Sequence, residues 1–139
     1  MSMLSAVPFA SARKVGRWLG RLGHTPFGVR RNVVERQIAA AFPEASSASV
    51  DHLVREAYSH FGEVLIETAL LPQLGRQGIL DLFEGAEGFE AIEEAHRAGN
   101  GIILITGHFG NWELAGAYVA ARGIPIECIV RRMNNPLFD

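Results

Sequence analysis

Residues 102–113 read IILITGHFGNWE, and this stretch decides how the rest of the chain is interpreted. Its first five residues are mostly β-branched and apolar without alternation, which is typical of a strand inside a parallel sheet. His108, Asn111 and Glu113 follow directly. In parallel α/β sheets, ligands bind beyond the carboxyl ends of the strands, where helix N-termini also point. The stretch therefore predicts a strand, a turn and a helix, with His108 in the turn.

The segments around this stretch predict alternating helices and strands. Gly-Asn-Gly at residues 99–101 ends a helix over 87–98. The helix after the turn covers 112–122, and Gly123 separates it from a second strand over 124–130. Such an alternation gives a right-handed α/β unit. Two strands do not make a stable sheet, so we expect an α/β fold of which only the start of an αβαβ sheet is present.

The chain before residue 80 predicts three helices. Residues 11–22 and 29–41 carry apolar side chains at helical spacing, and the dipeptide Phe42-Pro43 ends the second of these helices. We therefore divide the chain into a basic amphipathic helical region, residues 1–45, and the first part of an α/β domain, residues 46–139.

The third of these helices opens the second region. Serines at 46, 47 and 49 offer N-caps for it, and it is expected to stop before Pro72. Its apolar set includes Phe61 and Leu65 at helical spacing. A loop is expected over 73–78, and residues 80–83 fit either a short strand or a helical turn.

Charge is unevenly distributed. The net charge is −2, but residues 1–36 carry +6 and the remainder −8. Within 11–22, Val15, Trp18 and Leu19 fall on one helical face and most basic residues on others, which is typical of a helix in a membrane interface. The excess of basic residues in 1–36 is also compatible with binding to nucleic acid. The alternatives are a solvated basic helix and a helix packed on its own domain.

The bulk composition excludes several classes of protein. Hydrophobic residues make up 48% and charged residues 20%, which is typical of a globular chain. The single cysteine, Cys128, excludes an internal disulfide framework and favours a reducing compartment. A zinc-finger ligand set is missing, and no apolar run reaches 18 residues. The order of charged and apolar residues at the start does not match a cleaved signal peptide.

His108 and Glu113 are the candidate catalytic pair. On one continuous helix they would point about 140° apart, but a histidine just before the helix can reach a carboxylate in its first turn. Glu113 would then accept one ring proton and leave the other nitrogen free as a base. Asn111 is either an N-cap or a substrate hydrogen-bond donor, and Gly110 allows close approach. The alternative is that His108 and Asn111 merely cap a helix.

The stretch GHFGNWE resembles the signature of the late acyltransferases of lipid A biosynthesis, the lauroyl and myristoyl transferases. These belong to the lysophospholipid acyltransferase superfamily, whose mark is His, four residues, then Asp or Glu. Three further segments resemble the family: residues 30–44, RRNVVERQIAAAFPE; residues 85–101, with a Gly-x-Glu helix; and residues 131–139, RRMNNPLFD.

The resemblance implies a role for each candidate residue. His108 would be the general base toward a hydroxyl, and Glu113 would orient it. The acyl donor would be a thioester of acyl carrier protein or coenzyme A, with no cofactor and no metal. Gly110 and Asn111 would line the substrate, and Arg131, or Arg132, would bind phosphate or developing negative charge.

The resemblance also implies partners and a location. The acceptor would be a lipid A precursor, or another glycolipid such as a phosphatidylinositol mannoside. The enzyme would lie on the cytoplasmic face of a bacterial inner membrane, peripheral or weakly anchored, without a nucleic-acid partner. The family's chains are longer, so we expect a 139-residue N-terminal fragment to be inactive alone. A hydrolase that uses the same pair on water, and an inactive lipid-binding module, stay open.

Overall fold

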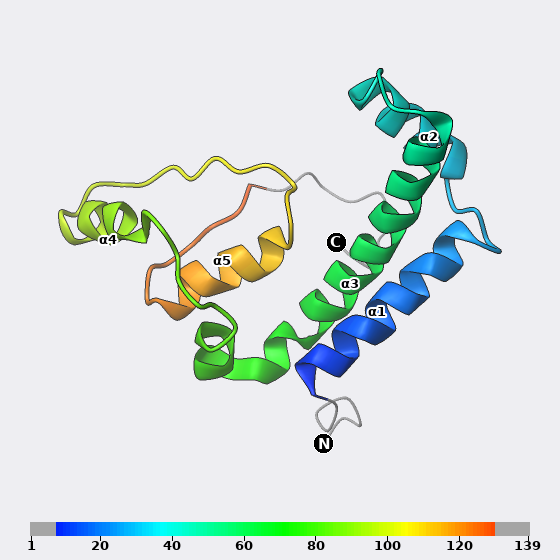
Figure 1. The fold of residues 1–139 in the computed structure, drawn as a ribbon. Coiled ribbons are helices and arrows are strands. Elements are labelled where there is room, and N and C mark those ends of the chain that lie inside the picture. Colours follow the sequence, from blue (N-terminus) through cyan, green and yellow to red (C-terminus); the bar gives the residue numbers. More distant parts are fainter. Residues whose placement is uncertain (1–7, 130–139) are drawn as a thin grey trace.

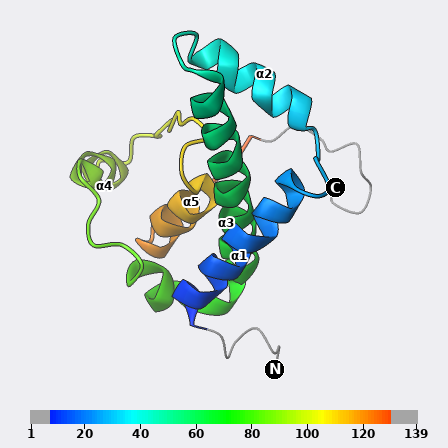
Figure 2. The ribbon, with the colours of Figure 1, turned by 45° about the vertical axis from the view of Figure 1, so that its right-hand side comes forward.

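A computed structural model describes residues 8–129 of the chain. In this part five helices follow one another: α1 (Phe9–His24), α2 (Arg31–Ala41), α3 (Ser47–Leu80), α4 (Phe89–Arg97) and α5 (Trp112–Ala121). Helix α3 is the centre of the arrangement, because α1, α2 and α5 all contact it. Helix α1 runs along α3, α2 lies at one end of it, and α5 lies on a different side from α1 (Figures 1 and 2).

Helices α1 and α3 approach so closely that their backbones touch. A Cβ built on Gly16 would lie 2.6 Å from the carbonyl oxygen of Gly62, and one built on Gly62 would lie 2.6 Å from the amide nitrogen of Gly20. Ala12, Gly16 and Gly20 recur every four residues and so share one face of α1. Small residues at this spacing allow close helix packing.

The α1 helix confirms the interpretation of a helix packed on its own domain. Its arginines point toward α3, where Arg13 and Arg17 pair with acids and Arg21 donates to Ser59. The apolar residues of the predicted amphipathic face point outward instead, and the exposed fraction of Trp18 is 58%. The buried face is therefore built from glycine, alanine and paired arginines.

Helix α3 continues past the predicted end at Pro72. Ser46 caps its start as expected, since its hydroxyl oxygen accepts a hydrogen bond from the Ser49 amide at 3.2 Å. The break falls at Gly75, with φ 63° and ψ 179°, a conformation open only to glycine. Pro72 lies inside the helix, where a proline removes one hydrogen-bond donor and kinks the helix. Helical turns continue beyond Gly75 as far as Leu80. The predicted loop over 73–78 was therefore wrong, and its one irregular point is Gly75.

The buried face of α3 also differs from the predicted apolar stripe. Phe61 and Leu65 are more than half exposed. The side that meets α1 carries Gly62 and Glu63, and Glu67 lies one turn further along. Hydrophobic periodicity cannot find this side, because glycine and glutamate score as polar or neutral.

An apolar cluster joins α4, α5 and the end of α3. Phe89, Tyr118, Val119 and Ile124 form its buried centre. Phe83 stacks on Tyr118 with ring centroids 4.2 Å apart, and residues 80–83 form a helical turn rather than a strand. The guanidinium of Arg122 lies 4.7 Å above the Phe89 ring, a cation–π contact at the end of α5.

The predicted strands at 102–106 and 124–130 are not formed within residues 8–129, where all regular structure is helical. A strand forms only when its backbone pairs with another strand, and no such pairing joins these two segments in the described part. Residue 130 lies outside the described residues. The α/β class is therefore not shown, and the described architecture is helical. The division of the chain at residue 45 stays a prediction.

Candidate functional site

The stretch GHFGNWE forms a loop that leads into α5. Asn111 is the N-cap of this helix, and its side-chain oxygen accepts a hydrogen bond from the Leu114 amide at 3.0 Å. Gly110, with φ +55°, supplies the left-handed turn just before the cap. His108 thus lies in the loop and Glu113 in the first helical turn, as the sequence predicts. The N-cap role predicted for Asn111 is confirmed.

Trp112 lies between the two candidate catalytic side chains. The His108 imidazole meets its ring edge to face, with centroids 4.6 Å apart. The Trp112 Nε1 donates a hydrogen bond to Glu113 Oε1 at 3.1 Å. Among the described contacts, no hydrogen bond joins His108 directly to Glu113, so the orienting pair stays a prediction. Both side chains are exposed, which leaves them open to a substrate.

Glu67 is a site neighbour that sequence reasoning missed. Its Oε2 accepts a hydrogen bond from Asn111 Nδ2 at 2.7 Å, across 44 positions of sequence. The side-chain amide nitrogen of Asn111, which was predicted as a possible hydrogen-bond donor to the substrate, thus donates to Glu67 of α3. The sequence spacing indicates only the contact of Glu67 with α1: Glu63 and Glu67 lie one turn apart on α3, as Arg13 and Arg17 do on α1.

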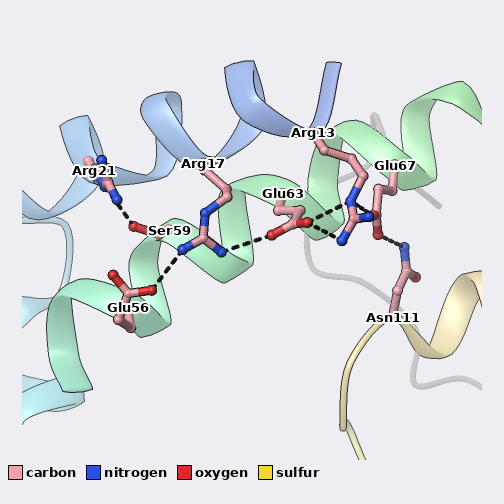
Figure 3. Close-up of polar contacts among 8 residues, drawn as sticks. All are labelled: Arg13, Arg17, Arg21, Glu56, Ser59, Glu63, Glu67 and Asn111. Atoms are coloured by element: carbon pink, nitrogen blue, oxygen red, sulfur yellow. Dashed lines mark hydrogen bonds and ion pairs between the residues drawn. The ribbon is translucent and has the colours of Figure 1, made fainter. Parts of the chain in front are cut away.

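An ion-pair network fills the polar part of the contact between α1 and α3 (Figure 3). Glu63 is its centre and is buried, and it accepts from Arg13 at 2.6 Å and from Arg17 at 3.0 Å. Arg17 also reaches Glu56 at 2.7 Å, and Arg13 Nε lies 2.9 Å from Glu67 Oε1. Buried carboxylates persist only when paired and hydrogen-bonded, which these are.

The network shifts the pKa of Glu63 and of Arg17. Burial would raise the pKa of Glu63, but hydrogen bonds from Arg17 and Arg13 outweigh it and hold that pKa below its usual range. The same carboxylates, Glu63 and then Glu56, raise the pKa of Arg17. Glu63 and Arg17 are therefore both charged at neutral pH.

This network predicts acid sensitivity. A carboxyl whose pKa is lowered by folding adds stability above its unfolded pKa, about 4.3 for Glu, and loses it as pH falls through the folded value. Glu63→Gln is expected to lower the free energy of unfolding by about 2 kcal/mol at pH 7, since charge-assisted hydrogen bonds are lost. The difference should shrink toward pH 3. Urea unfolding at both pH values measures it, with Glu84→Gln, an exposed acid, as control. An equal difference at pH 7 and pH 3 would contradict it.

Three further findings bear on the predicted chemistry. Arg131 and Arg132 lie outside the described residues, so their predicted roles stay predictions. Within residues 8–129, no three histidine, cysteine or acidic side chains gather where they could hold a metal ion. A search of the same residues for a helix long and apolar enough to cross a membrane found none.

Comparison with known proteins places the chain. A family model described as bacterial lipid A biosynthesis acyltransferase matches residues 1–139, so the chain belongs to that family. Among curated proteins it is 27% identical over 126 residues to lipid A biosynthesis acyltransferase 1 of Shigella flexneri. It is 26% identical over 126 residues to the lipid A biosynthesis myristoyltransferase of Escherichia coli (strain K12).

The alignments cover most of this chain but a much smaller share of each relative. Each alignment covers 91% of this chain but 38% of the relative. The chain therefore spans well under half the length of the curated relatives it matches. No solved structure matches the chain significantly.

Proposed function

We propose that the protein transfers a fatty acyl chain from a thioester of acyl carrier protein, or of coenzyme A, to a hydroxyl of a lipid A precursor. The observation that carries this proposal is the loop and helix built by GHFGNWE. It leaves His108 exposed in the loop and Glu113 in the first turn of α5, in a chain of the lipid A acyltransferase family. An exposed imidazole suits proton removal from a hydroxyl, and Glu113 lies on the other side of Trp112 from it.

The proposed step begins with the acceptor. A ring nitrogen of His108 takes the hydroxyl proton while the oxygen attacks the thioester carbonyl carbon. The tetrahedral intermediate collapses with cleavage of the carbon–sulfur bond, and the thiolate leaves and takes the proton back from the imidazolium. An ester and a free thiol result. Glu113 would accept the other ring proton, which requires its carboxylate to turn from Trp112 Nε1 toward His108.

Other residues support this step in the proposal. Gly110 gives the acceptor a close approach to the loop, and Arg131, with Arg132 as the second candidate, would bind phosphate or the developing oxyanion. We further propose that residues 102–106 pair as a strand in an α/β sheet of the whole protein. Ile103 and Ile105 lie two apart, on one face of such a strand, and are 89% and 94% exposed here. Apolar side chains this exposed favour a covered position.

We also propose that α1 contacts the cytoplasmic surface of the inner membrane through its outward face. Val15, Trp18 and Leu19 lie within one turn and are all exposed, and Lys14 lies beside them. A tryptophan among aliphatic residues, with a nearby lysine, fits the headgroup boundary of an anionic bilayer. Arg13 and Arg17 form ion pairs with Glu63 of α3, so in this proposal apolar contact supplies most of the binding to the membrane.

Vesicle sedimentation tests this surface. Trp18→Ser is expected to weaken binding to vesicles of phosphatidylethanolamine and phosphatidylglycerol by about tenfold, since burial of a half-exposed indole is lost. Phe42→Ser, which removes an aromatic residue of similar exposure beyond α2, serves as the matched control. Equal binding of both variants and the unchanged protein would refute the α1 surface.

A product assay tests the proposed activity. The full-length protein is incubated with a labelled acyl carrier protein thioester and a lipid A precursor, and products are separated by mass spectrometry. We expect one acyl chain gained per thiol released, with little release when the acceptor is omitted. Free fatty acid at the same rate without acceptor would indicate the hydrolase instead. Transfer only to a phosphatidylinositol mannoside would identify that glycolipid as the acceptor in place of a lipid A precursor. The absence of any reaction would favour a lipid-binding module.

A further inference from the structure

Glu67 stands out among the charged side chains of α3 because both of its carboxylate oxygens are engaged by different elements. The residue is 6% exposed. Its Oε1 lies 2.9 Å from Arg13 Nε on α1, and its Oε2 accepts from Asn111 Nδ2 at 2.7 Å (Figure 3). Removing a carboxylate from water costs several kcal/mol unless its partners are well placed. Here those partners are one arginine and the N-cap of α5.

Asn111 transmits this contact to the candidate site. Its amide nitrogen is held by Glu67 and its amide oxygen caps Leu114, so both ends of the side chain are fixed. Trp112, the next residue, begins α5 and packs its ring against the His108 imidazole. The position of the imidazole therefore depends on how the N-terminus of α5 is held against α3.

We propose that Glu67 is a positioning residue for the acyl transfer: through Asn111 it fixes the start of α5, and with it the placement of His108 and Glu113. This inference rests on the proposed function. Glu67 itself touches no reacting atom. Its role is to receive the Asn111 amide, while Arg13 balances its charge.

Exchanging the hydrogen-bond donor at position 111 and the acceptor at position 67 distinguishes a positioning role of Glu67 from a role in packing alone. Asn111→Asp keeps a residue that can cap a helix, because aspartate is as good an N-cap as asparagine. The second aspartate oxygen then faces Glu67, and two like charges replace one hydrogen bond. In the double variant Glu67→Gln with Asn111→Asp, the glutamine amide nitrogen can donate to the aspartate while its oxygen takes the place of the carboxylate oxygen near Arg13 Nε. Asn100→Asp, in the exposed turn after α4, adds the same charge without the contact.

The first measurement needs no activity. In the isotope-labelled protein, NMR reports the ring contact of His108 with Trp112 and hydrogen exchange of the Leu114 amide. We expect Asn111→Asp to lose the ring contact and to speed exchange at the Leu114 amide by about tenfold, because repulsion from Glu67 pushes the aspartate and the start of α5 out of the capping position. The double variant should restore both, and Asn100→Asp should change neither. An unchanged Asn111→Asp, or a double variant no better than the single one, would overturn the proposal.

The second measurement is acyl transfer by the full-length protein. Asn111→Asp should lower kcat by about 10- to 100-fold with little change in the acceptor KM, since catalysis is sensitive to small misplacements. The double variant should recover most of kcat. A KM effect alone, or no recovery, would count against positioning. If the unchanged protein transfers no acyl chain, the proposed function fails, and the NMR comparison still decides whether Glu67 holds the loop.

Discussion

Gly62→Ala is expected to lower the free energy of unfolding by about 3 kcal/mol, the upper part of the usual cost of overpacking. The added Cβ would overlap the carbonyl oxygen of Gly16 and lie 2.6 Å from the amide nitrogen of Gly20. Both neighbours are backbone atoms of α1, which cannot rotate aside as a side chain can. The two helices must separate, and the ion pairs of Glu63 with Arg13 and Arg17 would lengthen with them.

A glycine in an uncrowded helix gives the matched control. Gly116 lies in α5, and a Cβ there would lie 4.0 Å from the nearest side-chain atom. Gly116→Ala is expected to raise the free energy of unfolding by about 0.5–1 kcal/mol through helix propensity alone. Urea unfolding followed by circular dichroism measures both variants. If Gly62→Ala is as stable as the unchanged protein, the close contact between α1 and α3 is wrong.

Local sequence signals predicted most helix boundaries. Ser46 begins α3, Asn111 begins α5, and Phe42 before a proline ends α2, as expected. These signals work because capping and proline effects depend on residues within one turn. The end of α3 was misjudged, since the helical turns beyond the Gly75 break pack Ile79 and Leu80 on the cluster of Phe89 and Tyr118. Contacts of that kind lie far away in sequence.

The faces of α1 could not be predicted from hydrophobicity. Its buried side consists of Ala12, Gly16 and Gly20 with arginines, and its exposed side carries Trp18. A periodicity argument assigns the apolar side to the core, but close backbone packing and ion pairs to Glu63 stabilise the opposite side here. The spacing of small residues was the missed signal.

The candidate site shows the same limit. The order of loop, cap and first turn follows from GHFGNWE alone, so His108 and Glu113 were placed correctly along the chain. Glu67 could not be assigned to Asn111, because the pairing joins residues 44 positions apart and depends on how α3 and α5 pack. The strands are not formed in the described residues for a related reason: an apolar β-branched run indicates what a segment prefers, while pairing requires a partner.

His108→Ala is expected to lower acyl transfer by about a thousandfold, or about 4 kcal/mol in the barrier, which is typical for loss of a general base. The imidazole is exposed and its one aromatic contact in the described residues is with Trp112, so the fold should persist. The loss should appear in kcat, because the base acts on the reacting proton rather than in binding. His96→Ala, an exposed histidine on α4, should transfer at the normal rate.

The most direct test of the account is therefore the rate of acyl transfer by the full-length protein and its His108→Ala variant. Both are assayed with an acyl carrier protein thioester and a lipid A precursor, after circular dichroism shows equal helix content. The account predicts a normal rate for His96→Ala and a loss of about a thousandfold for His108→Ala. A folded His108→Ala protein that retains the normal rate would contradict it.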